Sequence, residues 1–287
     1  MRILDTHLHL WDPARLTYPW LEGVPALNRE LAAPQITAAV QHAGLRMGEE
    51  VESIFMQADC LPEQSLDEVA WVTSERGKVG LRGIVAFAPV ELPQLGEHLD
   101  ALASFELVVG VRRLLQGEPA GFAMSDAFVA GARQLAERGL VFDACVTHEQ
   151  LPEVAALADA VPELSIVLDH LGKPAVGSAE APRVPDHTWE RDLRALAQRP
   201  NVTCKLSGLP GESTGGWNEV QLAPFLDTAL DAFGAERLMF ASDWGASFGD
   251  DIKAGYGRWL DFVTRWAGEH AQQIIAGTGA RVYLGES

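Results

Sequence analysis

Eight short apolar runs recur along the 287-residue chain, and segments with helical periodicity separate most of them. The runs cover residues 3–10, 52–59, 80–88, 107–115, 140–146, 165–171, 202–209 and 237–244. Because most of them are continuously apolar rather than alternating, each strand is expected to be covered on both faces, as in a parallel sheet. Eight such β–α units in a chain of this length predict the α/β class and a (β/α)8 TIM barrel.

Three of the intervening segments show a clear helical period: residues 125–139, 151–162 and 222–234. The first opens at Ser125, a good N-cap residue, and closes at Gly139. A doubly wound open sheet is the structural alternative, but it usually carries a Gly-rich phosphate turn after its first strand, where this chain has "HLHLWDP". No linker or composition break is visible, so a single domain over residues 1–287 is predicted.

Charge and apolar patterning exclude several classes of partner. The formal net charge of -18 argues against nucleic acid and anionic membranes, which both require a basic face. The sequence contains no run of 18 apolar residues, so no membrane-spanning helix is predicted. The opening "MRILDTHLHL" lacks the pattern of a signal peptide, and the three cysteines are widely spaced, which together favour the cytoplasm. Homo-oligomerisation is left open by these features.

Four side chains capable of metal binding or proton transfer fall at predicted strand ends. Residues i and i+2 of a strand share a face, so His7 and His9 are expected to point inward together, with Ile3 and Asp5 below them. His170 closes the sixth strand and Asp243 the eighth. At one barrel mouth, three imidazoles and a carboxylate suit a divalent ion of the zinc type. Asp243 could also accept a proton from an attacking water.

Five motifs resemble the amidohydrolase superfamily, in particular its amidohydrolase-related branch of lactone hydrolases. They are "DTHLHLWDP" with "YPWL", then "GVRRLLQ", "LDHLGKP", "CKLSGL" and "ASDWG", in the expected order at the ends of the expected strands. The resemblance covers nearly the whole chain and implies a (β/α)8 barrel of amidohydrolase type. It further implies that His7 and His9 bind metal or substrate, with His170 beside them and Asp243 as catalytic base.

The same motifs suggest substrate-binding residues, each with a structural alternative. Arg112 matches the arginine of the family's fourth-strand motif, and the alternative is a salt bridge below the rim. Lys205 shares a strand face with Thr203 and Ser207 and would need a partner if buried, so an ion pair is the alternative. Four aromatic residues could stack on a sugar-like ring or only pack the loops: Trp11, Tyr18, Trp20 and Trp244.

Departures from the superfamily pattern bear on the cofactor. The fourth strand lacks the lysine that bridges two metals in many amidohydrolases, and the fifth lacks a histidine, with His148 just after it. One divalent ion held by His7, His9, His170 and Asp243, zinc being the first choice, is therefore expected, with metal-independent catalysis as the alternative. The chain also has Gly245 in "SDWG", where relatives often have proline, and Arg113 where many relatives have histidine.

The predicted function is hydrolysis of a lactone, most simply a fucono-, rhamnono- or other aldono-type sugar-acid lactone. A dicarboxylate pyrone would require several positive groups, for which Arg82, Arg112, Lys173 and Lys205 are candidates. Three further functions fit the scaffold: non-oxidative decarboxylation of an aromatic acid, metal-dependent amide or phosphoester hydrolysis, and sugar binding without catalysis. Asp243 beside the histidines argues against the last, because a binder requires no proton acceptor there.

Overall fold

The computed structural model describes residues 2–286 and contains an eight-stranded parallel sheet in the order β1 to β8. The strands are β1 (Ile3–Leu8), β2 (Val51–Met56), β3 (Leu81–Phe87), β4 (Val108–Arg112), β5 (Val141–Ala144), β6 (Ile166–Leu168), β7 (Val202–Leu206) and β8 (Leu238–Phe240). Each lies within a predicted run or overlaps it closely, which confirms the TIM-barrel prediction. The observed strands are shorter because residues at their carboxyl ends enter the loops that carry the polar side chains.

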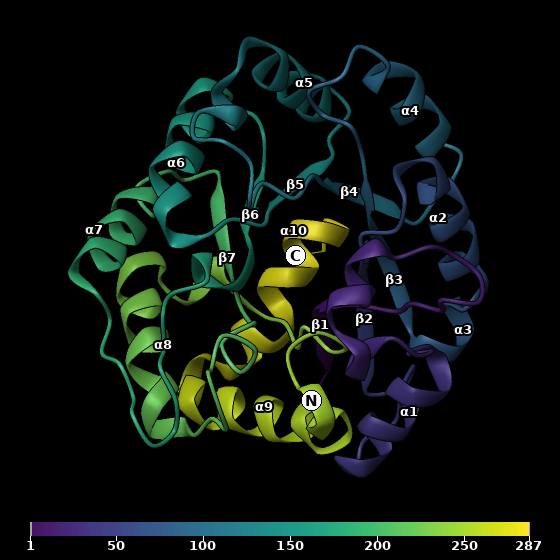
Figure 1. The fold of residues 1–287 in the computed structure, drawn as a ribbon. Coiled ribbons are helices and arrows are strands. Elements are labelled where there is room, and N and C mark those ends of the chain that lie inside the picture. The colour runs from purple at the N-terminus through teal and green to yellow at the C-terminus, as the bar shows by residue number, and fades with distance from the viewer. Residues whose placement is uncertain (1, 287) are drawn as a thin grey trace.

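Helices α1 to α9 surround the ring of strands in Figure 1. They are α1 (Ala33–His42), α2 (Ser65–Ser74), α3 (Arg76–Val79), α4 (Leu95–Leu102), α5 (Asp126–Glu137), α6 (Leu151–Ala160), α7 (His187–Leu196), α8 (Glu219–Phe233) and α9 (Ile252–Ala267). As predicted, Ser125 caps α5 by accepting a hydrogen bond from the Phe128 backbone amide. Among the described helices, none has the length and apolar character required to cross a membrane.

The first and last strands meet at the carboxyl end of the barrel. Leu8 and Trp244 form a parallel bridge, and the Asp243 amide donates to the His7 carbonyl at 2.9 Å. Below this bridge, the buried Asp5 carboxylate accepts from both the backbone amide and the hydroxyl of Ser242, at 2.8 and 2.6 Å. These contacts join two segments that carry predicted site residues, so closure of the barrel also fixes His7 relative to Asp243.

A tenth helix, α10 (Thr278–Leu284), lies within the ring of strands in Figure 1 and forms the floor of the barrel. One apolar cluster joins this segment to the barrel interior; its buried members are Leu4, Ile54, Met56, Val85, Val141, Val167, Met239, Ala276, Ala280 and Tyr283. Gly279 approaches β1 so closely that an added Cβ would lie 2.4 Å from Thr6 Cγ2. The sequence patterns did not predict this floor.

The side-chain orientation predicted along β1 is wrong below His7. Leu4 belongs to the interior cluster, whereas Ile3 packs in the separate core between strands and outer helices. The register between β1 and β2 shifts between Asp5 and Leu8, and such an irregularity rotates the following side chains relative to the sheet. In a regular strand, Ile3 and His7 would share a face. Here His7 faces the interior of the barrel and Ile3 does not.

Candidate active site

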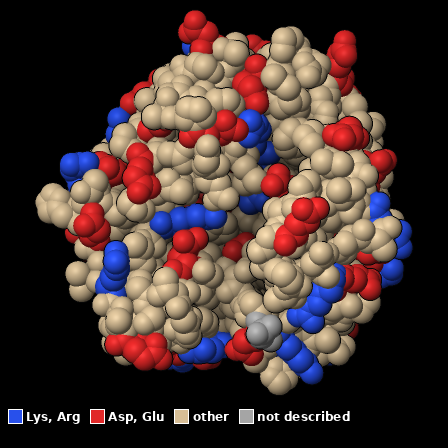
Figure 2. Space-filling model, in the orientation of Figure 1, with Lys and Arg blue, Asp and Glu red and all other residues tan. Residues whose placement is uncertain are grey.

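A cavity of about 220 Å³ opens at the carboxyl end of the barrel. Six of the residues predicted to form the site line it: His9, Trp11, Trp20, Arg112, His170 and Asp243. His7 lies directly beneath, fully buried, with Nε2 3.1 Å from His9 Nε2. In the space-filling view the same face is hollowed near its centre, and both basic and acidic side chains border the hollow (Figure 2).

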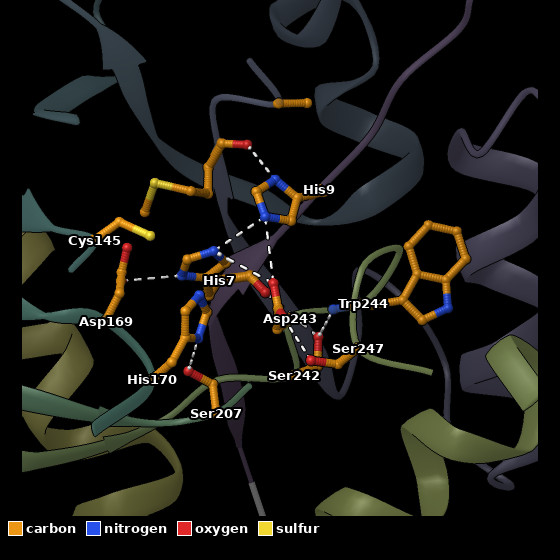
Figure 3. A network of polar contacts seen from close by, with 12 residues as sticks. His7, His9, Cys145, Asp169, His170, Ser207, Ser242, Asp243, Trp244 and Ser247 are labelled. Atoms are coloured by element: carbon orange, nitrogen blue, oxygen red, sulfur yellow. Dashed lines mark hydrogen bonds and ion pairs between the residues drawn. The ribbon is translucent and has the colours of Figure 1, made fainter. Parts of the chain in front are cut away.

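The hydrogen-bond partners of His7 and His9 determine which ring nitrogens face each other. His9 Nδ1 lies 2.9 Å from the Met56 carbonyl, which can only accept, so this nitrogen carries the proton. His7 Nδ1 lies 3.2 Å from both the Asp169 carboxylate and Lys205 Nζ, so this nitrogen alone does not decide the tautomer. The Arg112 donor, 3.3 Å from His7 Nε2, favours the same tautomer as in His9. Both Nε2 atoms then present lone pairs to a shared point, which Figure 3 shows beside Asp243.

These donors have the spacing that a tetrahedral metal ion requires. The two Nε2 atoms are 3.1 Å apart, and Asp243 Oδ1 lies 3.6 Å from His7 Nε2 and 3.3 Å from His9 Nε2. Ligands about 2.0–2.1 Å from zinc in a tetrahedron are separated by about 3.3 Å. His170 offers a further nitrogen, because His7, His170 and Asp243 each place a ligand atom within 4.8 Å of the others.

The arrangement brings electron-rich atoms together, and the protein supplies little positive charge to offset their mutual repulsion. Arg112 Nη1, 3.3 Å from His7 Nε2, is the cationic group that contacts this point. Its partner nitrogen, Nη2, donates to the Gln57 carbonyl at 2.6 Å. Two lone pairs and a carboxylate oxygen facing one another favour a bound cation, so the donor set fits a divalent ion.

Burial keeps His7 and His170 neutral, and the surrounding groups keep Asp243 ionised. Burial lowers the pKa of His7 well below its usual range, and burial likewise lowers that of His170 to about 4. Burial by itself would raise the pKa of Asp243, but His170, His9 and His7 outweigh it and hold that pKa below its usual range. At neutral pH the site therefore presents unprotonated imidazole nitrogens, which are able to bind metal, and a carboxylate able to accept a proton.

Both His170 and Asp243 adopt left-handed backbone conformations just beyond their strands, with φ of 55° and 53°. Non-glycine residues occupy this region at a cost of about 1–3 kcal/mol, and such strain concentrates at functional sites. His170 contacts Ser207 Oγ through Nδ1 at 2.8 Å, and Ser247 Oγ donates to Asp243 Oδ2. Gly208 is required beside this histidine, because an added Cβ would lie 2.6 Å from His170 Cβ.

Gly245 explains one departure noted in the sequence. Its φ of 102° is inaccessible to proline, and an added Cβ would lie 2.7 Å from the Trp11 ring. Trp11 in turn packs edge-to-face on Trp20, with ring centroids 5.2 Å apart. The aromatic wall of the cavity therefore depends on the glycine that follows Trp244.

A layer of buried charges lies between the cavity and the apolar floor. Lys205 Nζ contacts Asp143 Oδ1 and lies 3.1 Å from Asp169 Oδ1, and all three side chains are inaccessible to solvent. Arg112 Nη1 is 3.4 Å from Asp169 Oδ2. The Tyr283 hydroxyl of α10 donates to Asp143 at 2.7 Å. Asp169 thus orients His7 while Lys205 and Arg112 compensate its charge, which is typical of the groups that support metal-binding histidines.

Two predicted substrate-binding residues lie away from the cavity, and this corrects the prediction. Lys205 is fully buried beneath it, held by the two aspartates, so the ion-pair alternative describes its position. The Trp244 ring points away from the histidines in Figure 3, and its indole nitrogen donates to the Ile252 carbonyl at 3.0 Å. Tyr18 and His148 do not line the cavity either.

Other residues at the site were missed by sequence reasoning. The cavity wall also includes Asp59, Gln116 and Cys145, and the charged layer includes Asp143 and Asp169. The two aspartates carried a recognisable signal, since each interrupts an otherwise apolar strand run. Asp59 and Gln116 lie in loops, where a polar residue carries no such signal.

The barrel fold and the His/Asp cluster at the carboxyl ends of its strands define a class of protein. Its members are TIM-barrel proteins whose site is suited to a metal ion. A family model described as "Amidohydrolase" matches residues 4–272. The chain belongs to the amidohydrolase family, and it is a hydrolase-type enzyme by that membership.

Among its relatives, an L-fucono-1,5-lactonase from Burkholderia multivorans is 32% identical, over 98% of this chain and 95% of the relative. An L-rhamnono-gamma-lactonase from Scheffersomyces stipitis is 28% identical over 57% of this chain and 55% of its own length. A crystal structure of a Burkholderia multivorans amidohydrolase with bound zinc superposes with a TM-score of 0.82, at 31% identity and 99% coverage of both chains.

Proposed function

We propose that this protein hydrolyses the cyclic ester of a sugar-acid lactone of the fucono-, rhamnono- or related aldono type. The observation that carries the proposal is the meeting of an ionised Asp243 with two unprotonated imidazole nitrogens beneath an aromatic-walled cavity. The similarity to an L-fucono-1,5-lactonase over almost the full length of both chains supports the substrate class.

In the proposed reaction, Asp243 removes a proton from a water molecule as that water adds to the lactone carbonyl carbon. The ring C–O bond then breaks, and the same proton passes to the leaving ring oxygen, so the product is a hydroxy acid. Arg112 lies at the cavity wall, where its guanidinium can stabilise the developing oxyanion. Ser247 donates to the second oxygen of Asp243 and so fixes the orientation of the carboxylate beside the cavity.

His7, His9, His170 and Asp243 are the residues that would hold one divalent ion, and their nitrogen and oxygen donors favour zinc. When bound, such an ion supplies Lewis-acid polarisation of the carbonyl and lowers the pKa of water. Arg112 and the Met56 carbonyl favour, in the two imidazoles, the tautomer that this role requires. The same nitrogens could polarise the carbonyl through hydrogen bonds if the enzyme works without metal.

A dicarboxylate pyrone fits this cavity less well. Of the four cationic candidates, only Arg112 and Lys173 line the cavity, whereas Lys205 is paired with buried aspartates. Arg82 pairs with Glu52 and Glu286 and is not part of the cavity wall. Two cations and a nearby acidic residue, Asp59, favour a neutral substrate over a doubly charged one.

The test is proton release from a panel of aldonic-acid lactones, measured with enzyme as purified, after chelation and after restoration with zinc. Loss on chelation and recovery with zinc would establish metal dependence, whereas indifference to chelation would support direct polarisation by the histidines. If no lactone is hydrolysed faster by the wild type than by Asp243→Asn, the proposal is wrong, and carbon dioxide release from aromatic acids becomes the next assay.

We further propose that residues 1–287 act as a single domain on a small-molecule substrate in the cytoplasm, without nucleic acid or membrane partners. The acidic net charge of -18 supports the absence of nucleic acid.

A further inference from the structure

Asp59 lies in the loop that follows β2, is exposed to solvent, and is one of the residues that line the cavity. Among the contacts of residues 2–286, that carboxylate has no hydrogen bond or ion pair, although Arg112, Lys173 and Asp243 surround the same cavity. Two other carboxylates at the mouth are engaged: Asp169 with Lys205, and Asp243 with His9 and Ser247. Of the two aspartates that line the cavity, Asp59 is therefore the one whose carboxylate is free to meet a ligand.

The protein holds Asp59 in a conformation that the residue would not adopt unaided. Its φ is 59°, in the left-handed region, which it shares with His170 and Asp243 at the same mouth. Strain of this kind persists only where surrounding contacts fix the backbone, and an observed outlier beside a site is a reason to look for a role.

Three side chains supply those fixing contacts. The buried Gln57 accepts from the Asp59 backbone amide through Oε1 at 2.6 Å, and the buried Glu68 accepts from the Ala58 amide at 3.0 Å. Trp20, part of the aromatic wall, donates its indole N–H to the Ala58 carbonyl at 2.9 Å. The turn that presents Asp59 is thus tied to the wall on which a sugar ring would stack.

We propose that Asp59 is a specificity-determining residue that accepts hydrogen bonds from substrate hydroxyl groups and disfavours a substrate carboxylate at the same position. This inference rests on the proposed lactonase function. An ionised carboxylate offers two oxygens to adjacent hydroxyls, and hydrogen bonds to a charged acceptor are stronger than neutral ones. A neighbouring anion would instead meet like charge, which is how a site rejects an unwanted substrate.

The test compares D-glucono-1,5-lactone, which carries hydroxyls, with δ-valerolactone, which has the same ring without them. We expect Asp59→Asn to lower kcat/KM for the hydroxylated lactone about 10- to 100-fold, mainly through KM, and that for δ-valerolactone less than 3-fold. A site built to hydrogen-bond a hydroxyl discriminates on this basis. Asparagine and glycine both tolerate positive φ, so Asp59→Gly serves as a second variant whose backbone is not strained.

Glu63→Gln is the matched control, since it neutralises a carboxylate four residues further along that does not line the cavity. Thermal unfolding of every variant checks that it is folded. If both lactones lose activity equally in the two Asp59 variants, or neither does while the wild type is active, the inference is wrong and the proposed function stands. A wild type that hydrolyses no lactone of the aldonic-acid panel would overturn both. Faster hydrolysis of 2-pyrone-4,6-dicarboxylate by Asp59→Asn would add support.

Discussion

The lower and upper halves of the barrel interior are built on the same strands and are stabilised in opposite ways. At the floor, Leu4, Val167 and Met239 pack with α10. The apolar surface that this packing removes from water stabilises the fold. Above them, Lys205 and Asp169 are equally buried, but the cost of desolvating charges offsets much of their attraction. The comparison indicates that the floor stabilises the fold and that the upper half orients the histidine cluster at some expense of stability.

The largest effect is expected at Asp243, the proton acceptor of the proposed reaction. Asp243→Asn removes the proposed proton acceptor and should lower kcat on a hydrolysed lactone about 10²- to 10⁴-fold. The free energy of unfolding should also fall, because the neighbouring histidines hold the pKa of this buried carboxyl below its usual range and Ser247 donates to it. Initial rates and urea unfolding measure the two quantities. Asp231→Asn, at an exposed position, is the control, and a loss below tenfold in Asp243→Asn would remove the base from the mechanism.

Breaking the charged layer should lower the free energy of unfolding. The expected loss is similar in size to the rise in activation free energy expected for Asp243→Asn. Lys205→Met leaves Asp143 with Tyr283 as its remaining partner, and losing one partner of a buried ion pair destabilises by about 3–5 kcal/mol. Adding Asp143→Asn to this variant should restore part of the loss. Urea unfolding of both variants checks this; a single variant within about 1 kcal/mol of wild type would contradict the assigned pairing.

A substitution at the floor should separate stability from activity. Met239→Ala removes a fully buried side chain from the cluster around α10 and should cost about 3 kcal/mol of unfolding free energy. The kcat of the folded enzyme should stay within about threefold of wild type, since Met239 lies below the charged layer. A much larger fall in kcat at full folding would show that the two halves are coupled.

The smallest predicted effect is a pH dependence of stability that comes from Glu68, a buried residue of α2 bonded to the loop before Asp59. Burial raises the pKa of Glu68 from 4.5 to about 8. Between these values the folded chain keeps a proton that the unfolded chain has released, so stability is greatest at low pH and falls as pH rises, by up to about 1.4 kcal/mol per unit. Between pH 6 and 8, the free energy of unfolding of Glu68→Gln should therefore fall by about 2 kcal/mol less than that of the wild type. Equal slopes in urea unfolding would contradict this, with Glu63→Gln as control.

The sequence was sufficient for the outer frame and for the reactive cluster. Apolar runs predicted all eight strands because each must be covered on both faces. His170 and Asp243 could be placed beside His7 and His9 because parallel strands of a barrel end at one mouth. These inferences depend on local composition and on a closed topology, both of which a single sequence reveals.

What could not be predicted depends on distant contacts. The shift in register after Asp5 changes which side chains of β1 face inward, and no local pattern marks it. Lys205 lies beneath the cavity because two aspartates from other strands meet it there. Trp244 turns away because the Ile252 carbonyl accepts its indole N–H. Asp59 was overlooked because its position depends on Gln57 and Glu68, which act through backbone amides.

The floor of the barrel also constrains how the chain is made. Helix α10 packs against β1, β3, β4 and β8, so the helix that seals the interior leaves the ribosome long after β1 has emerged. Until then the lower ends of the strands remain open, with the floor residues exposed to water and to neighbouring nascent chains. We expect translation to deliver an unsealed barrel that chaperones can engage, and the last step of folding to begin only when α10 leaves the exit tunnel.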